Sequence, residues 1–188
     1  MEDSEIIRLY WQREPRAIDE TSGKYGSYCM TVARNILGSP EDSEECVNDT
    51  WLGAWNSMPP HKPDVLRLFL AKITRRLSLD RVRSGKTRKR GGGELPAALD
   101  ELSECIASET DVEGDAIAGE LGEAVGRFVA ALPDREAAVF LRRYFFTEPI
   151  AKIAESCGLK EGSITSMLCR TRKKLGDYLK KEGWFDES

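Results

Sequence analysis

The sequence has one histidine, and its five cysteines never stand two residues apart. Structural zinc sites need four Cys or His ligands with paired spacing, so this pattern argues against one. An odd number of cysteines without a signal-peptide pattern is typical of a reducing cytoplasm. We interpret His61 as a loop residue rather than a ligand. We therefore expect a cytoplasmic protein with no metal site and no cofactor.

Long apolar runs and alternating strand patterns are also missing. No stretch approaches the length of a membrane span, so we expect no membrane insertion. Nearly every periodic segment repeats its apolar residues at helical spacing. Ser39-Pro40-Glu41-Asp42 reads as a helix start, with a serine cap, a proline and acids in the first turn. The pattern predicts an all-α protein.

Breaks in this periodicity divide the chain into two small helical domains. Gly85 to Gly93 contains no apolar residue and ends the first domain. The acidic stretch that follows reads as a flexible linker, in which a short helix could form around Leu99 to Ile106. Four further helical stripes follow, the second of which places Ala137, Phe140, Leu141 and Tyr144 inward. We predict domains over 1–88 and 118–188, joined by a linker over 89–117.

The net charge of −4 hides a strong segregation of charge along the chain. From Lys62 to Arg90 there are eleven lysines and arginines against two acids. From Glu94 to Glu123 there are ten acids and no base. Such blocks indicate a basic binding surface followed by an acidic linker.

The last sixty residues predict a helix-turn-helix with a basic flank. Ala154, Gly158 and Ile164 occupy the small, turn and apolar positions of that motif. The second helix begins near Glu161 and presents short polar side chains that can reach base edges, with cations beyond them for phosphates. The alternative is an ordinary helical hairpin with solvated lysines. The two preceding helices and the basic continuation favour DNA binding.

Two further charged features have open interpretations. The acids at 41–49 can be a solvated face at a helix start, a docking face for a basic partner, or a metal or acid/base site. Composition alone favours the solvated face. The basic helix after the proline-rich loop 58–63 can be a solvated face with Phe69 in the core. Alternatively, it can hold single-stranded nucleic acid while the loop pockets a base, which the charge of the whole block favours. Trp51 and Trp55 read as core residues.

Four segments together resemble the extracytoplasmic-function (ECF) sigma factors, small two-domain specificity subunits of bacterial RNA polymerase. Residues 42–51 (DSEECVNDTW) are similar to the family pattern DAEDxxQxxF. Residues 69–81 (FLAKITRRLSLDR) are similar to its WLxxIARNxxxDxxR helix. Residues 132–136 and 141–145 are similar to LPxRxRxVxxLRYF, and residues 161–166 to the xGTVKSR recognition helix. The resemblance extends over nearly the whole chain and implies transcription initiation without enzymatic activity.

The resemblance implies three groups of site residues and their partners. Contacts to duplex DNA at the −35 element fall on Ser163, Thr165, Ser166, Cys169, Arg170, Arg172 and Lys173. Contacts to single-stranded DNA at the −10 element fall on His61, Lys62, Phe69, Lys72, Arg75, Arg76, Asp80 and Arg83. Docking on core polymerase falls on Asp42, Glu44, Glu45, Asn48, Asp49 and Trp51. The implied partners are promoter DNA, the largest-subunit clamp and second-largest-subunit flap of the polymerase, and an anti-sigma factor.

The chain departs from the family pattern at several positions. Asn48 replaces Gln, Phe69 replaces Trp, Arg76 replaces Asn, and Met167 replaces a frequent arginine. Residues 146–149 (FTEP) replace the commoner EGLS. A stand-alone helix-turn-helix regulator remains the main alternative function, with a protein-interaction adaptor and a metal-dependent nuclease built on the acids at 41–49 behind it.

Overall fold

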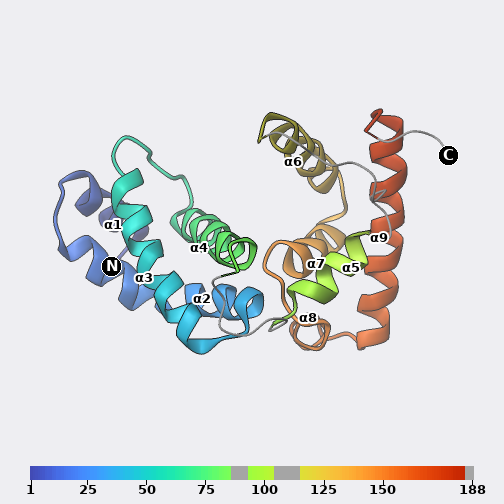
Figure 1. Cartoon of the computed structure of the whole chain (residues 1–188), viewed down its shortest axis with the longest axis horizontal. Helices are drawn as coiled ribbons and strands as arrows, with labels where there is room; N and C mark the ends of the chain where they lie inside the picture. Colours follow the sequence, from blue (N-terminus) through green and yellow to red (C-terminus); the bar gives the residue numbers. More distant parts are fainter. Residues whose placement is uncertain (86–92, 104–114, 185–188) are drawn as a thin grey trace. The chain divides into compact units, whose positions relative to one another are not determined.

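A computed structural model describes residues 1–85, 93–103 and 115–184 of the chain (Figure 1). Within these ranges the chain forms nine α-helices and no strand, which confirms the all-α prediction. The helices belong to two compact units, Met1–Leu95 and Pro96–Ser188. None of the helices in the described ranges is long and apolar enough to span a membrane.

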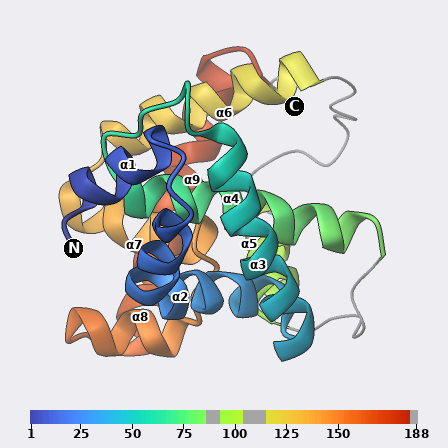
Figure 2. The ribbon, with the colours of Figure 1, turned by 90° about the vertical axis from the view of Figure 1, so that its left-hand side faces the viewer.

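The first unit is built on three long helices. These are α2 (Arg16–Leu37), α3 (Pro40–Ser57) and α4 (Leu66–Arg83), which pack pairwise against one another (Figures 1 and 2). The buried side chains at their centre come from the apolar stripes expected from the sequence, including Cys29, Ala33, Val47, Ala54, Leu66 and Leu70. A three-helix core therefore positions the outward faces of α3 and α4.

The junction between α2 and α3 follows the predicted start signal. Gly38 ends α2 with a φ of 69°, a left-handed conformation that glycine adopts at little cost. The Ser39 hydroxyl then accepts a hydrogen bond from the backbone N–H of Asp42 at 3.3 Å, and Pro40 opens the helix. Local chemistry thus fixes where the acidic residues of α3 begin.

A short N-terminal helix, α1 (Asp3–Trp11), was not predicted from the sequence. Asp3 and Glu5 lie in its first turn, and Ile6, Ile7 and Tyr10 are buried. The Tyr10 hydroxyl donates a hydrogen bond to Thr21 Oγ1 on α2 at 2.9 Å. This contact satisfies a polar group that is enclosed in the core.

Helices α3 and α4 meet along a buried ladder of small polar side chains. Thr50 Oγ1 lies 3.1 Å from Thr74 Oγ1, and Cys46 Sγ lies 3.2 Å from Ser78 Oγ. All four side chains are fully buried. The hydroxyls of Thr50, Thr74 and Ser78 also bond backbone carbonyls one turn earlier in their own helices. Small residues at these positions let the two helices approach closely.

The second unit contains the remaining five helices. They are α5 (Leu95–Ser103), α6 (Asp115–Ala130), α7 (Asp134–Tyr144), α8 (Ile150–Cys157) and α9 (Glu161–Lys181). Their core includes Ala124, Phe128, Phe140, Ile153, Leu168 and Leu175. Leu141 was expected to point inward but is exposed, because α7 turns Val139, Phe140 and Tyr144 towards the core instead.

Helix α5 lies within the segment that the sequence predicted as linker. It begins at Leu95, earlier than the helix expected around Leu99 to Ile106, and Ala98 joins the core of the second unit. The apolar spacing of Ala98 and Leu102 explains this packing, since both positions face the same side of a helix. The predicted linker residues 89–92 and 104–114 lie outside the described residues.

Candidate nucleic-acid interface

Helices α8 and α9 form the predicted helix-turn-helix. Gly158 takes a left-handed conformation with a φ of 63°, and the N–H of Leu159 donates to the carbonyl of Ala154 at 3.0 Å. Ala154 and Ile164 are both buried where the two helices meet. All three motif positions therefore play the structural roles expected of them.

The outer face of α9 carries most of the residues predicted to contact duplex DNA. Ser163, Ser166, Arg170 and Lys173 are exposed, and their spacing of three and four residues places them along one side of the helix. Thr165 and Cys169 are also exposed, beside that line. Short polar groups thus precede two cations along the same helix, an order suited to base edges followed by phosphates.

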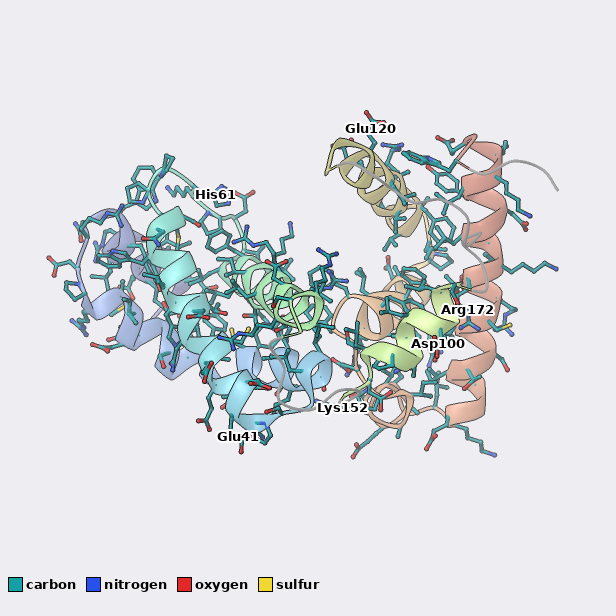
Figure 3. All side chains as sticks on the ribbon, in the orientation of Figure 1. Glu41, His61, Asp100, Glu120, Lys152 and Arg172 are labelled. Carbon is teal, nitrogen blue, oxygen red and sulfur yellow. The ribbon has the colours of Figure 1, made fainter. Side chains whose placement is uncertain are left out.

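Arg172, also predicted to contact duplex DNA, is not on the exposed outer face of α9. Its side chain is only 12% exposed, and its Nη1 donates to the Tyr144 hydroxyl at 2.9 Å and lies 3.8 Å from Glu101 Oε2. Figure 3 shows Arg172 on α9 and Asp100, the neighbour of Glu101, on α5. Sequence spacing along α9 could not reveal these partners, because they come from α7 and α5.

The loop before α8 is held by two neighbouring arginines at the end of α7. Arg142 donates to the carboxylate of Glu148 at 2.9 Å and to the hydroxyl of Ser156 at 2.9 Å. Arg143 donates to the backbone carbonyl of Glu148 at 2.9 Å. These bonds join α7, the loop and α8, and so fix the helix on which α9 rests.

A groove in the first unit collects several residues predicted to bind single-stranded DNA. It encloses about 600 Å³ between the proline-rich loop and α4, and its lining includes His61, Lys62, Phe69, Lys72 and Arg76. The rings of His61 and Phe69 stack with their centroids 5.1 Å apart. An aromatic wall beside three exposed cations can hold a base and the phosphates that flank it.

Three other residues of that predicted group lie outside the groove lining. Arg75 is half-buried, and burial lowers the pKa of its guanidinium, with a further contribution from the charge of Arg83. Arg83 is exposed near the end of α4, where its Nη1 lies 3.9 Å from Asp80. The structure therefore brings together five of the eight predicted residues.

The acids of α3 form an exposed face on the first unit. Glu44, Glu45, Asn48 and Asp49 all reach solvent. Arg81 of α4 bridges two of them, since its guanidinium lies 3.0 Å from both Glu45 and Asp49. Burial tends to lower the pKa of Arg81, but the bonds to these two carboxylates outweigh it and raise the pKa.

Two residues predicted to dock on a partner are instead part of the interior. Asp42 is 2% exposed at the capped start of α3, and Trp51 is 7% exposed in the core. Leu52, which the sequence analysis did not single out, is 58% exposed. It stands four residues after Asn48 and eight after Glu44, so an apolar side chain lies on the same side of the helix. The spacing of Leu52 from Glu44 and Asn48 was the sequence signal that could have revealed its exposure.

The acids at 41–49 do not converge as a metal site would require. Across the described parts of the chain, no group of three or more His, Cys, Asp or Glu side chains is placed to hold a metal ion. Glu45 and Asp49 are turned towards Arg81 instead.

Comparisons with known proteins identify both units. Residues 23–88 match the family model for sigma-70 region 2, and residues 122–175 match that for sigma-70 region 4. The two matches together cover well over half of the chain. The chain therefore belongs to the sigma-70 family.

Within the sigma-70 family, the chain is similar to two ECF sigma factors, the group that the sequence resemblance indicated. The chain is 24% identical over 163 residues to the ECF RNA polymerase sigma factor SigE of Mycolicibacterium smegmatis, covering 87% of this chain. It is 29% identical over 160 residues to the ECF RNA polymerase sigma factor SigJ of Mycobacterium tuberculosis, covering 79% of this chain. The chain spans 62% and 46% of the length of these two relatives.

Proposed function

We propose that this chain directs promoter-specific transcription initiation as a dissociable subunit of bacterial RNA polymerase. The observation that carries the proposal is the presence of two separate basic surfaces and one acidic face on a chain with sigma-70 regions 2 and 4. A stand-alone regulator needs only the basic surface of α9. The additional groove and the acidic α3 face favour a subunit that bridges polymerase and promoter.

In the second unit, α9 would lie in the major groove at the −35 element. Ser163, Thr165 and Ser166 would meet base edges, since short polar side chains near a helix N-terminus can approach them closely. Arg170 and Lys173 would bind phosphates and set the orientation of the helix. Cys169 lies beside them and would face the backbone of the duplex.

In the first unit, the groove beside α4 would capture an unpaired base of the −10 element. The base would stack against His61 or Phe69, while Lys62, Lys72 and Arg76 attract the flanking phosphates. Extruding a base costs a few kcal/mol, which these contacts must offset. Arg75, Asp80 and Arg83 would act from the adjoining turns of α4, where Arg83 extends the positive surface.

The α3 face would dock on the clamp of the largest polymerase subunit. We assign this contact to Glu44, Glu45, Asn48, Asp49 and Leu52, since Asp42 and Trp51 stabilise the unit from within. Exposed acids steer association with a basic partner, and the apolar Leu52 adds surface that docking can bury. The second unit would in turn contact the flap of the second-largest subunit.

The proposal extends to localisation and control. The protein would act with the polymerase in the cytoplasm, and the nucleotide chemistry would belong to the polymerase rather than to this chain. An anti-sigma factor that masks these surfaces would restrain it until a signal arrives, as the family resemblance implies.

Run-off transcription tests the proposal most directly. Purified bacterial core polymerase is incubated with a genomic fragment library, with and without this protein. Discrete new transcripts whose templates share −35 and −10 sequences are expected. Leu52→Ala and Lys72→Ala should reduce them, whereas Arg34→Ala, at an exposed position on α2, should not.

Two outcomes would contradict the proposal. If a cognate core polymerase neither bound the protein nor initiated with it, the docking assignment would be wrong. If the free protein instead bound a specific duplex tightly without polymerase, the stand-alone regulator would become the better conclusion.

A further inference from the structure

The acidic segment between the two matched family regions contributes a buried ion-pair network to the DNA-binding unit. Glu101 of α5 precedes the region 4 match, which begins at residue 122, and so lies outside it. Its carboxylate accepts two hydrogen bonds from Arg143, from Nε at 3.1 Å and from Nη2 at 2.8 Å. The Tyr144 hydroxyl donates to the same carboxylate at 2.9 Å.

This network is set deep in the second unit. The Arg143 side chain is 2% exposed, the most enclosed cation of the described ion pairs. A buried guanidinium requires a paired and hydrogen-bonded counter-charge, and a two-pronged carboxylate is the geometry that suits it best. Glu101 supplies that charge, so displacement of α5 would take this two-pronged carboxylate away from Arg143.

The network continues from α7 to the DNA-binding helix. Tyr144 is bonded to Glu101 on one side and accepts from Arg172 Nη1 on the other, at 2.9 Å. Burial raises the pKa of the Tyr144 hydroxyl, which keeps it protonated as a donor to Glu101. Arg172 therefore joins α9 to α7 and α5 rather than extending into solvent beside Arg170.

We propose that Glu101 and Arg172 are positioning residues: α5 is an integral part of the DNA-binding unit and sets the placement of α9, while Arg172 contacts no phosphate. The inference rests on the proposed function. It also reverses the role that the sequence predicted for Arg172. The network itself does not bind DNA. It places α9 so that the exposed face of this helix can contact duplex DNA.

Salt-dependent DNA binding separates positioning from phosphate contact. The full chain is titrated against a short labelled duplex of mixed sequence over a range of salt concentrations. Each phosphate contact contributes about 0.9 to the slope of log K against log salt. Arg170→Gln should lower the slope by about 0.9. Arg172→Gln should weaken binding and leave the slope unchanged.

Glu101→Gln gives the sharper test, because charge and positioning predict opposite signs. Removing an acid near a DNA-binding surface should tighten binding if only charge matters. Positioning by α5 predicts weaker binding, several-fold, with an unchanged slope. Asp100→Asn is the matched control, since it removes the same charge from the exposed neighbouring position. It should leave binding unchanged or slightly tighter.

Hydrogen exchange of the free full-length protein provides a readout that does not depend on DNA. Glu101→Gln and Arg172→Gln should each speed exchange in α9, and the double variant should add little to the stronger single one, because both act on one network. Unchanged exchange in α9 would overturn the inference. So would a slope lowered by Arg172→Gln, or tighter binding with a steeper slope for Glu101→Gln.

Failure of the inference is distinguishable from failure of the proposed function. If Arg170→Gln and Lys173→Gln left duplex binding unchanged, the assignment of α9 to DNA would be wrong. The exchange experiment would still decide whether α5 positions α9. If Arg170→Gln weakened binding as expected but Arg172→Gln lowered the slope equally, only the positioning role would fall.

Discussion

The imidazole of His61 stacks on the ring of Phe69, with the two planes inclined by 23°. His61 belongs to the proline-rich loop and Phe69 to α4, so the stack joins the loop to the basic helix. Phe69 packs against the core on its inner side, and the groove opens beside it. One wall of the proposed base pocket is therefore built before any DNA arrives.

Replacing His61 by alanine should weaken capture of single-stranded DNA without affecting folding. His61 is exposed, so the unfolding temperature should change little. Base stacking on an aromatic ring contributes about 1–3 kcal/mol, so binding should fall roughly fivefold or more. The measurement is binding of the polymerase complex to the labelled non-template strand of a promoter found by run-off. Equal binding by His61→Ala and the control Arg34→Ala would contradict the assigned pocket.

The neighbours Trp51 and Leu52 should respond in opposite ways to alanine substitution. Trp51→Ala removes a buried aromatic side chain and should cost about 3–5 kcal/mol of unfolding free energy. Leu52→Ala removes an exposed side chain and should leave stability unchanged while weakening association with core polymerase. Thermal unfolding by circular dichroism and co-purification with core provide the two readouts. A folded Leu52→Ala variant that binds core like the wild type would remove Leu52 from the docking face.

The contribution of Glu101 to stability should depend on pH. Burial would raise its pKa, but the bonds from Arg143 and Tyr144 outweigh burial and hold the pKa below its usual value of 4.5. Because this pKa is lower in the folded chain than in the unfolded chain, the carboxylate stabilises the unit above about pH 4.5. That stabilisation is lost as the pH falls through the folded pKa. The difference in unfolding temperature between wild type and Glu101→Gln should thus be largest near neutral pH and shrink in acid, which a constant difference would refute.

Thr147 should tolerate glycine better than alanine. Its φ of 55° lies in the left-handed region, which costs a residue with a Cβ about 1–2 kcal/mol. Both substitutions remove the same buried atoms beyond Cβ, but only alanine keeps the backbone penalty. We expect Thr147→Gly to unfold at a higher temperature than Thr147→Ala, with a difference of about 1 kcal/mol in unfolding free energy. The reverse order would mean that neighbouring contacts, rather than the Cβ, determine this turn.

Features that depend on local periodicity were predictable from the sequence. The stripes of α2, α3, α8 and α9 repeat at helical spacing, and burial of one face follows from that repeat. The serine cap before α3 and the glycine between α8 and α9 act through neighbouring backbone groups. Helix α1 was not predicted, because its apolar pattern of Ile6, Ile7 and Tyr10 extends over only two helical turns.

Features that depend on residues far apart in the chain were not predictable. An acidic composition suggested a solvated linker at α5, yet one of its acids has a buried arginine as partner in α7. Arg172 has the same residue type and helix as Arg170, and only its position relative to Tyr144 separates their roles. Trp51 differs from these two, because its helical spacing already indicated a core residue, and only the family resemblance suggested docking.

The ladder of Cys46, Thr50, Thr74 and Ser78 has a mechanical consequence for the proposed initiation factor. Sliding α3 past α4 by one helical turn, about 5.4 Å, would separate both cross-helix contacts and unpack the small side chains that let the helices approach closely. The ladder therefore fixes the distance between the acidic face of α3 and the groove beside α4. In the proposed complex, a polymerase bound to the acidic face of α3 would therefore hold the groove at a fixed distance from that contact.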